Sequence, residues 1–179
     1  MLLQPNKEWR WLFESSRQRM TLLLGRDLQF ITELEGHKMN IAGHSAQEFT
    51  CEQTRRYYQL VERLQVFDWP IPVKVQVVLN ALTMAEYHKP VMPQSWFFEQ
   101  GSEMQPCEVG DIIAMKTHYG HADFMVLEVE ATTALCMALD PETPLSSTKT
   151  LNRFGVIKVM RDRIIDQHSL LPSQYAYAG

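Results

Sequence analysis

The stretch Val78-Leu79-Asn80-Ala81-Leu82 leads through Tyr87-His88-Lys89-Pro90 into Met92-Pro93-Gln94-Ser95-Trp96-Phe97-Phe98. Its first part is the end of a nearly all-apolar helix. Pro90 stops that helix, because proline lacks the backbone N–H and crowds the preceding turn. The prolines then order a passage into three consecutive aromatic residues. Such a passage is typical of a junction between two packed units and contains no catalytic group, so it favours a binding protein over an enzyme.

The residues before the junction predict an α/β domain over residues 1–97. Two short apolar runs flank Gly25-Arg26-Asp27, a spacing that predicts a β-hairpin. In the second run, Leu28–Leu34, successive residues alternate between two faces, with Phe30 and Thr32 together on one of them. Residues 35–48 are polar and carry two glycines, so we expect a loop there.

Two helices are predicted to complete this domain. Thr50 and Gln53 have the capping-box spacing, in which each side chain bonds the backbone amide of the other. The second helix runs from about Pro72 to His88 and is apolar around most of its circumference, which is typical of a buried helix. A thin uncharged stripe interrupts it, formed by Gln76, Asn80 and Thr83. We therefore expect the second helix at the centre of the domain.

After Phe98 the sequence changes to short apolar runs separated by turn residues. This spacing favours a small antiparallel β-barrel-like domain over residues 98–179. The predicted fold class is therefore α+β, with an N-terminal α/β domain followed by a β-barrel-like one.

Composition narrows the functional classes. The net charge of −4 argues against nucleic acid and anionic membranes, because such partners usually require a basic excess. The cysteines Cys51, Cys107 and Cys136 are widely spaced and form no Cys-x-x-Cys pair, so neither a zinc site nor a disulfide framework is indicated. No apolar window has the length of a membrane span, and no signal peptide is evident. We expect a soluble, cytoplasmic protein without a cofactor.

Candidate catalytic groups all have simpler interpretations. His118 and His121 flank a turn and have one nearby acidic residue, Asp123, which is too few ligands to predict a metal site. Glu128 and Glu130 lie two apart, as expected for the solvated face of a strand. The Gly-x-Ser-x-Gly motif of serine hydrolases and the glycine patterns of phosphate-binding loops are both missing. The sequence therefore predicts a protein that is not an enzyme.

Two segments are candidate binding sites. The first is the junction from Lys89 to Phe98, whose aromatic residues and lysine suit a docking site or, alternatively, a plain inter-domain core. The second is a basic cluster in an otherwise acidic chain, formed by Lys149, Arg153, Lys158, Arg161 and Arg163. This cluster could bind an acidic partner surface or a phosphate backbone. The alternative is that its charges only protect a solvated strand edge against pairing with other strands.

The chain also resembles a known family. The matching residues are Asn6 with Trp9-Arg10-Trp11, Arg19-Met20 with Leu22 and Leu24, Val78-Leu79-Asn80-Ala81-Leu82, Lys89-Pro90, Met92-Pro93, Ser95-Trp96 with Phe98, Ala134-Leu135-Cys136, Ile157-Lys158, Met160 and Asp162-Arg163. In register over residues 5–165, they are similar to ZapC, the FtsZ-associated cell-division family of gammaproteobacteria. Gln94 departs from the basic residue expected in that family, which puts a charge-based role at this position in doubt.

The resemblance implies a cytoplasmic, non-enzymatic protein with an α/β domain and a twisted β-barrel-like domain. Its implied role is to bind the tubulin-like GTPase FtsZ at mid-cell, bundle FtsZ protofilaments and stabilise the division ring. We expect a monomer, which can bundle filaments only if it has two binding surfaces. No membrane contact is expected. The alternative is a small nucleic-acid-binding protein that uses the basic C-terminal strand and stacks bases on Phe154.

Specific residues follow as hypotheses for FtsZ binding. Leu22, Lys89 and Trp96 are expected to border one surface. In the strand 154–160, alternation would place Lys158 on an apolar face with Phe154, at the mouth of a depression. Arg161 and Arg163 are expected beside Lys158, where the strand ends.

Overall fold

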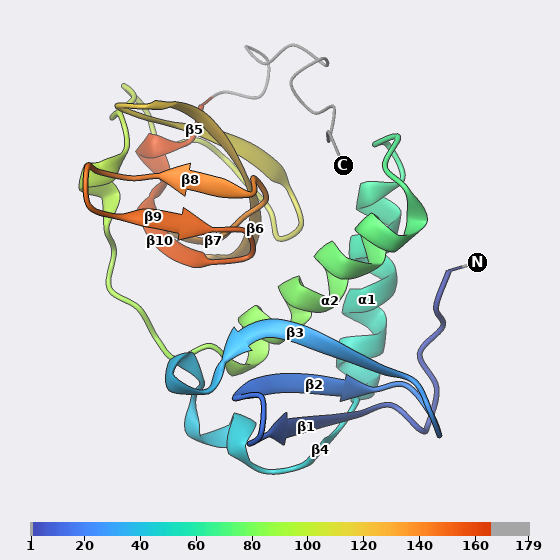
Figure 1. Ribbon diagram of the computed structural model, residues 1–179. Coiled ribbons are helices and arrows are strands. Elements are labelled where there is room, and N and C mark those ends of the chain that lie inside the picture. Colours follow the sequence, from blue (N-terminus) through green and yellow to red (C-terminus); the bar gives the residue numbers. More distant parts are fainter. Residues whose placement is uncertain (1, 166–179) are drawn as a thin grey trace. The chain divides into compact units, whose positions relative to one another are not determined.

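The computed structural model describes residues 2–165, which fold into two compact units that divide between Pro90 and Val91 (Figure 1). Within the described residues, the first unit, Met1–Pro90, holds both α-helices, and the second, Val91–Gly179, consists of strands and short turns. The predicted α+β fold class is confirmed. The sequence analysis divided the chain after residue 97, whereas the amide of Gln94 already bonds the carbonyl of Lys158 in the second unit.

The first unit is a four-stranded antiparallel sheet, in the order β3-β2-β1-β4, with two helices. Its elements are β1 (Arg10–Glu14), β2 (Arg19–Leu23), β3 (Gln29–Glu35), the 3₁₀ turns η1 (Gly36–Lys38) and η2 (Ile41–His44), β4 (Gln47–Glu48), α1 (Cys51–Leu64) and α2 (Ile71–Tyr87). The predicted hairpin is confirmed, because β2 and β3 pair around Gly25. The φ of Gly25 is +145°, a conformation that favours glycine.

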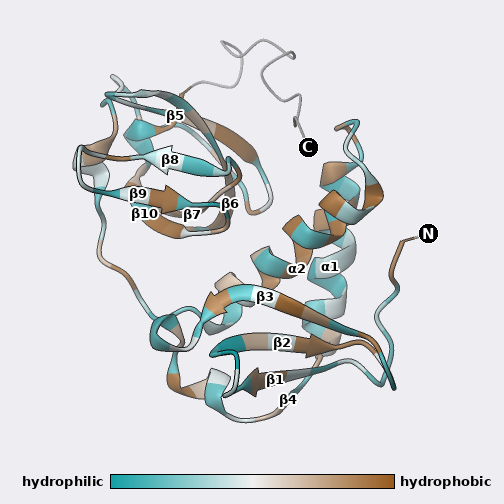
Figure 2. Cartoon of the chain, viewed as in Figure 1, coloured by the Kyte–Doolittle hydropathy of each residue, from teal (hydrophilic) through white to brown (hydrophobic). Residues whose placement is uncertain are grey.

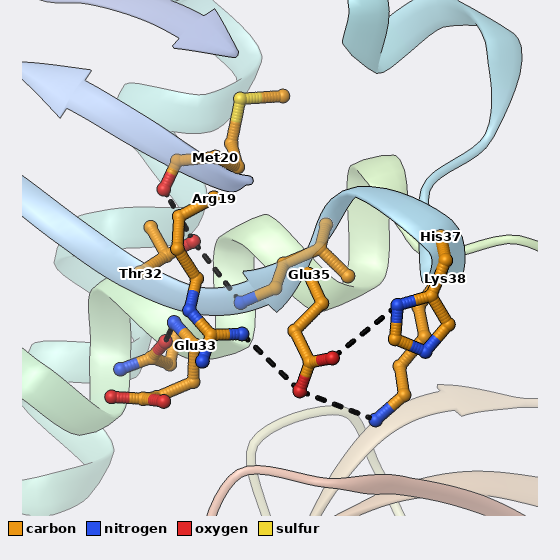
Figure 3. A network of polar contacts seen from close by, with 9 residues as sticks. Arg19, Met20, Thr32, Glu33, Glu35, His37 and Lys38 are labelled. Atoms are coloured by element: carbon orange, nitrogen blue, oxygen red, sulfur yellow. Dashed lines mark hydrogen bonds and ion pairs between the residues drawn. The ribbon is translucent and has the colours of Figure 1, made fainter. Parts of the chain in front are cut away.

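The alternation predicted for β3 is also confirmed. Thr32 and Leu34 are buried, whereas Ile31 and Glu33 are exposed. The register of β2 against β3 shifts at one end of the pair, between Arg19 and Thr21. There the Thr32 hydroxyl donates to the carbonyl of Met20 at 2.7 Å, and the Glu33 amide donates to the side chain of Asn80 at 2.8 Å (Figure 3).

Helix α1 begins at the predicted capping box. The Thr50 hydroxyl accepts from the Gln53 amide at 3.1 Å, and Gln53 Oε1 accepts from the Thr50 amide at 3.0 Å. The same Oε1 accepts from the indole N–H of Trp11 at 2.9 Å, so the cap also joins the helix to β1. Because the Thr50 amide and the Trp11 indole donate to the same oxygen, the start of α1 is fixed on the sheet.

Helix α2 is buried around most of its circumference, as predicted, and hydrophobic residues recur along it (Figure 2). The uncharged stripe has a structural explanation at Asn80, which is 2% exposed and bonds β3 on one side and the carbonyl of Gln76 on the other. The Thr83 hydroxyl donates to the carbonyl of Leu79. These bonds satisfy the polar groups of a buried helix internally.

The expected loop over residues 35–48 is more ordered than its composition suggests. It contains η1, η2 and β4, which pairs with β1. The amide of Asn40 bonds the carbonyl of Tyr87 at 2.7 Å, and the amide of Lys89 bonds the carbonyl of Lys38 at 2.8 Å. The segment is therefore tied to the end of α2, a long-range pairing that local composition does not reveal.

The second unit has a four-stranded antiparallel sheet in the order β10-β7-β6-β5 and a separate hairpin, β8-β9. Its elements are η3 (Ser95–Phe97), β5 (Ile112–Thr117), β6 (Gly120–Val129), β7 (Thr133–Ala138), β8 (Glu142–Pro144), β9 (Thr150–Asn152), β10 (Val156–Met160) and η4 (Arg161–Arg163). The barrel-like closure is not confirmed, because β10 and β5 remain the two ends of an open sheet.

Residues 94–99, here called the strap, connect these two ends. The Gln94 amide donates to the carbonyl of Lys158 on β10 at 2.8 Å. The Glu99 amide donates to the carbonyl of Lys116 on β5, also at 2.8 Å. Between them Phe98 enters the core and meets Phe124 edge-on, with ring centroids 5.7 Å apart. The strap thus covers both edges of the sheet.

Candidate partner-binding surfaces

The first candidate surface is a group of charged side chains where β2, β3, η1 and the end of α2 meet. We call it the basic corner and define it as Arg19, Glu35, His37, Lys38 and Lys89. β2 begins with Arg19 and β3 ends with Glu35, and these two residues are partners in the antiparallel register. Backbone bonding between Lys38 and Lys89 brings the end of α2 to the same place.

Glu35 is the centre of the basic corner (Figure 3). Its carboxylate lies 3.2 Å from Arg19 Nη1, 3.3 Å from His37 Nδ1 and 3.8 Å from Lys38 Nζ. The Lys89 ammonium donates to the carbonyl of His37 at 3.2 Å and so extends the group. Arg19 and Lys38 therefore share one carboxylate with His37, and Lys89 adds a further cation beside them, which leaves the corner with an excess of positive charge.

The pKa shifts agree with this charge balance. Partial burial opposes ionisation of Glu35, but the bond from Arg19 and the charges of Lys38 and His37 together lower its pKa. Burial lowers the pKa of the neighbouring His88, and the positive charges of Lys38 and Lys89 lower it further, against the bond to the Lys89 carbonyl. Burial is the main cause of the shift at His88, and the two lysines act in the same direction.

Leu22 does not belong to any surface, and this part of the prediction is wrong. Its side chain is 0% exposed and lies on the inner face of β2, opposite Trp11 on β1 and Phe30 on β3. Sequence alternation does not tell which face of a strand is covered by helices. Lys89 is exposed in the first unit, and Trp96 is exposed in the second.

The second candidate surface is the outer side of the strap. Trp96 is 70% exposed, unusual for so large an apolar side chain, and Met92 just before the strap is also exposed. The ring of Phe97 lies 5.6 Å from that of Trp96, and the Lys149 ammonium lies 5.2 Å from the Phe97 centroid. Lys149 also donates to Gln94 Oε1 at 3.0 Å. The strap thus displays an aromatic group beside a fixed cation.

Several bonds hold the strap rigidly at Ser95. Its hydroxyl accepts from the amide of Met160 at 2.7 Å, and its carbonyl accepts from Arg163 Nε at 3.1 Å. Arg163 also contacts Asp162 at 2.7 Å. The backbone that carries Trp96 is therefore fixed, which lowers the ordering cost of binding through its side chain.

Two residues of the predicted basic cluster, Lys158 and Arg161, are engaged by other groups of the second unit. The Lys158 ammonium pairs with Glu130 at 3.0 Å. Arg161 donates to the carbonyls of Gln105, Glu130 and Ala131 at 3.1 to 3.2 Å, and so joins three segments. The sequence revealed these cations but not the carbonyls that bind them.

The expected orientation of Lys158 is also wrong. Ile157 and Val159 are the residues of β10 that face the core, so Lys158 lies on the opposite face. Phe154 precedes β10 in a turn with a φ of +65° and is buried. A buried ring cannot stack on bases, which removes the stacking residue from the nucleic-acid alternative.

Other groups were considered as ligand sites. His118 is in the turn between β5 and β6, and His121 is on β6. Across residues 2–165, no three His, Cys, Asp or Glu side chains are grouped as a metal site would require. Over the same residues, no helix combines the length and hydropathy needed to cross a bilayer.

Fold and surfaces together define a two-unit α+β protein with one exposed, rigidly held surface in each unit. Two family models cover the chain: cell-division protein ZapC, N-terminal, matches residues 2–89, and cell-division protein ZapC, C-terminal, matches residues 90–169. Their division agrees with that between the two units. The chain therefore belongs to the ZapC family of cell-division proteins.

Individual relatives give the same result. The chain is 37% identical to cell division protein ZapC of Aeromonas hydrophila over 164 residues, 92% of each chain. It is 34% identical to the protein of that name from Photobacterium profundum over 164 residues, 91% of this chain and 92% of the relative. The Shewanella oneidensis protein of that name is 32% identical over 180 residues, the full length of both.

Proposed function

We propose that this protein binds FtsZ in the cytoplasm at mid-cell, bundles FtsZ protofilaments and stabilises the division ring. It does so as a monomer, without a cofactor and without catalysing a reaction. Membership of a cell-division family supports this function. The observation that carries it is the presence of one exposed surface in each unit, because a monomer needs two surfaces to join two filaments.

Each surface has a distinct chemistry. The basic corner offers Lys89 and its neighbouring cations to acidic groups on FtsZ. The strap offers Trp96 as an apolar anchor. Lys158, Arg161 and Arg163 support the second surface: Arg163 and the Lys158 carbonyl bond the strap directly, and Arg161 fixes the adjoining segment at Gln105.

Co-sedimentation with FtsZ and GTP tests the function. The protein is expected in the pellet with FtsZ filaments, and GTP turnover is expected to fall because lateral bundling slows subunit exchange. A protein that stays in the supernatant at micromolar concentration, while FtsZ filaments sediment normally, would rule the function out.

Single variants test the two surfaces separately. Lys89→Glu and Trp96→Ser should each retain binding through the other unit but lose bundling, visible as single filaments by electron microscopy. Both side chains are exposed, so each free energy of unfolding should stay within about 0.5 kcal/mol. Lys7→Glu, an exposed lysine elsewhere on the first unit, is the matched control for charge reversal. Bundling that persists in either variant would remove that residue from the site.

A further inference from the structure

The outer face of the first unit's sheet has an apolar row that no function above uses. In the strand register, Leu12 on β1 lies beside Thr21 on β2, and Thr21 lies beside Ile31 on β3. Leu12 is 39% exposed and Ile31 is 40% exposed, whereas Thr21 between them is buried. Solvated faces of antiparallel sheets usually carry polar side chains, so two exposed apolar side chains on either side of a buried threonine are informative.

The two ends of this face differ in charge. At one end Arg10 lies opposite Glu48 of β4 in register, which balances the charge. At the other end the next outward residues are Glu14, Arg19, Glu33 and Glu35, and Arg19 and Glu35 belong to the basic corner. Glu14 pairs with Arg17 at 3.6 Å. The apolar row therefore continues into a region of mixed charge, in which the cations Arg19, Lys38 and Lys89 exceed the carboxylates Glu33 and Glu35 by one.

We propose that the FtsZ-binding surface of the first unit extends from the basic corner across the outer sheet face to Leu12 and Ile31. This inference rests on the proposed function and adds the chemistry of the bound segment. The segment has apolar side chains that cover the row and carboxylates at the end that meets Lys38 and Lys89. Charge sets its direction and the apolar contact supplies affinity, the usual division between rim and centre of an interface.

The first experiment is co-sedimentation of FtsZ filaments with the double variant Leu12→Thr/Ile31→Thr. Threonine suits a solvated strand, so the fold should be retained. Affinity should fall about tenfold, because the exposed parts of two apolar side chains are lost to the interface. Leu28→Thr is the matched control, since Leu28 is exposed but alternates to the other face of the strand. Unchanged affinity of the folded double variant would overturn the proposal.

If the double variant does not fold, two single variants with opposite charges at Ile31 test the same proposal. Ile31→Glu and Ile31→Lys place opposite charges on the same exposed site. Because the bound segment carries carboxylates, Ile31→Glu should weaken binding several-fold more than Ile31→Lys. Equal affinities would overturn the proposal.

Sedimentation velocity of the protein alone tests the other possible occupant, a second copy of the chain. The protein and its variants should all be monomeric. A dimer that Leu12→Thr/Ile31→Thr dissociates without changing FtsZ affinity would assign the face to self-association and overturn the proposal. If the unmodified protein does not bind FtsZ, the proposed function itself is wrong. If the protein binds FtsZ and the Leu12 and Ile31 variants bind equally well, only the extension of the surface is wrong.

Discussion

The basic corner of the first unit and the basic cluster of the second unit look alike in sequence and differ in structure. In the corner, Arg19 and Lys38 share the carboxylate of Glu35, and Lys89 bonds only the carbonyl of His37. In the cluster, Lys158 has its own acid, and Arg161 is occupied by backbone carbonyls. The side chains of Lys38 and Lys89 are therefore exposed in the first unit, whereas those of Lys158, Arg161 and Arg163 are half-buried and engaged within the second. A count of lysines and arginines does not distinguish a binding surface from an internal support.

The largest effect is expected from Arg161→Ala. This change removes three bonds from a charged donor that joins three segments, so the free energy of unfolding should fall by about 2 kcal/mol. Urea unfolding of the variant measures the loss. Arg26→Ala in the exposed turn between β2 and β3 is the control and should cost at most about 0.5 kcal/mol. If both variants lose the same stability, Arg161 is not an internal support.

A smaller effect is expected on the salt dependence of FtsZ binding. Lys38→Gln combined with Lys89→Gln should lower affinity about tenfold at low salt, since each exposed cation contributes at most about 1 kcal/mol. The dependence of affinity on ionic strength should become flatter, because fewer charges remain to be screened. Lys158→Gln should leave that slope unchanged. If the salt dependence of affinity changes in Lys158→Gln and not in the Lys38 and Lys89 variant, the second unit and not the basic corner supplies the binding charge.

The smallest effect concerns one acidic group in each unit, Glu35 and Asp123, whose pKa values shift in opposite directions. In the first unit, Glu35 has a lowered pKa, so its contribution to stability is lost as pH falls through that value. In the second, burial and the charge of Asp140 raise the pKa of Asp123 to about 6 from 3.8. Its contribution is complete below pH 3.8 and is lost as pH rises through 6.

Asp123→Asn should therefore stabilise the protein at pH 7.5 and have little effect at pH 4. The gain should be about 1 kcal/mol, well below the full pKa difference, because much of the carboxyl remains open to solvent. Thermal unfolding at the two pH values measures it. An equal change at both would mean that ionisation of Asp123 is not the cause.

The sequence predicted features that depend on neighbouring residues. The capping box of Thr50 and Gln53, the hairpin around Gly25 and the buried character of α2 are all local patterns, and all are confirmed. The family resemblance, carried by residues such as Lys89-Pro90 and Ser95-Trp96, is confirmed as well.

The basic corner could not be predicted in the same way, because it depends on a register shift. Continued from the pairing of Thr21 with Ile31, a regular hairpin would place Arg19 opposite Glu33. The irregularity after Thr21 moves Arg19 to Glu35, where η1 and Lys89 are also present. Asn80 bonds the displaced amide of Glu33, so a polar residue on a distant helix sets the position of the corner.

The strap that carries Trp96 has a consequence for solubility. Open strand edges are templates for aggregation, and the strap covers one edge of β10 and one edge of β5 with its own backbone. The amide of Ile165 adds a second bond to β5 at Ala114. Lengthening the strap would loosen its bond to β10 and leave β5 covered by Ile165 alone. Insertion variants in the strap are therefore expected to aggregate more readily than the unmodified protein.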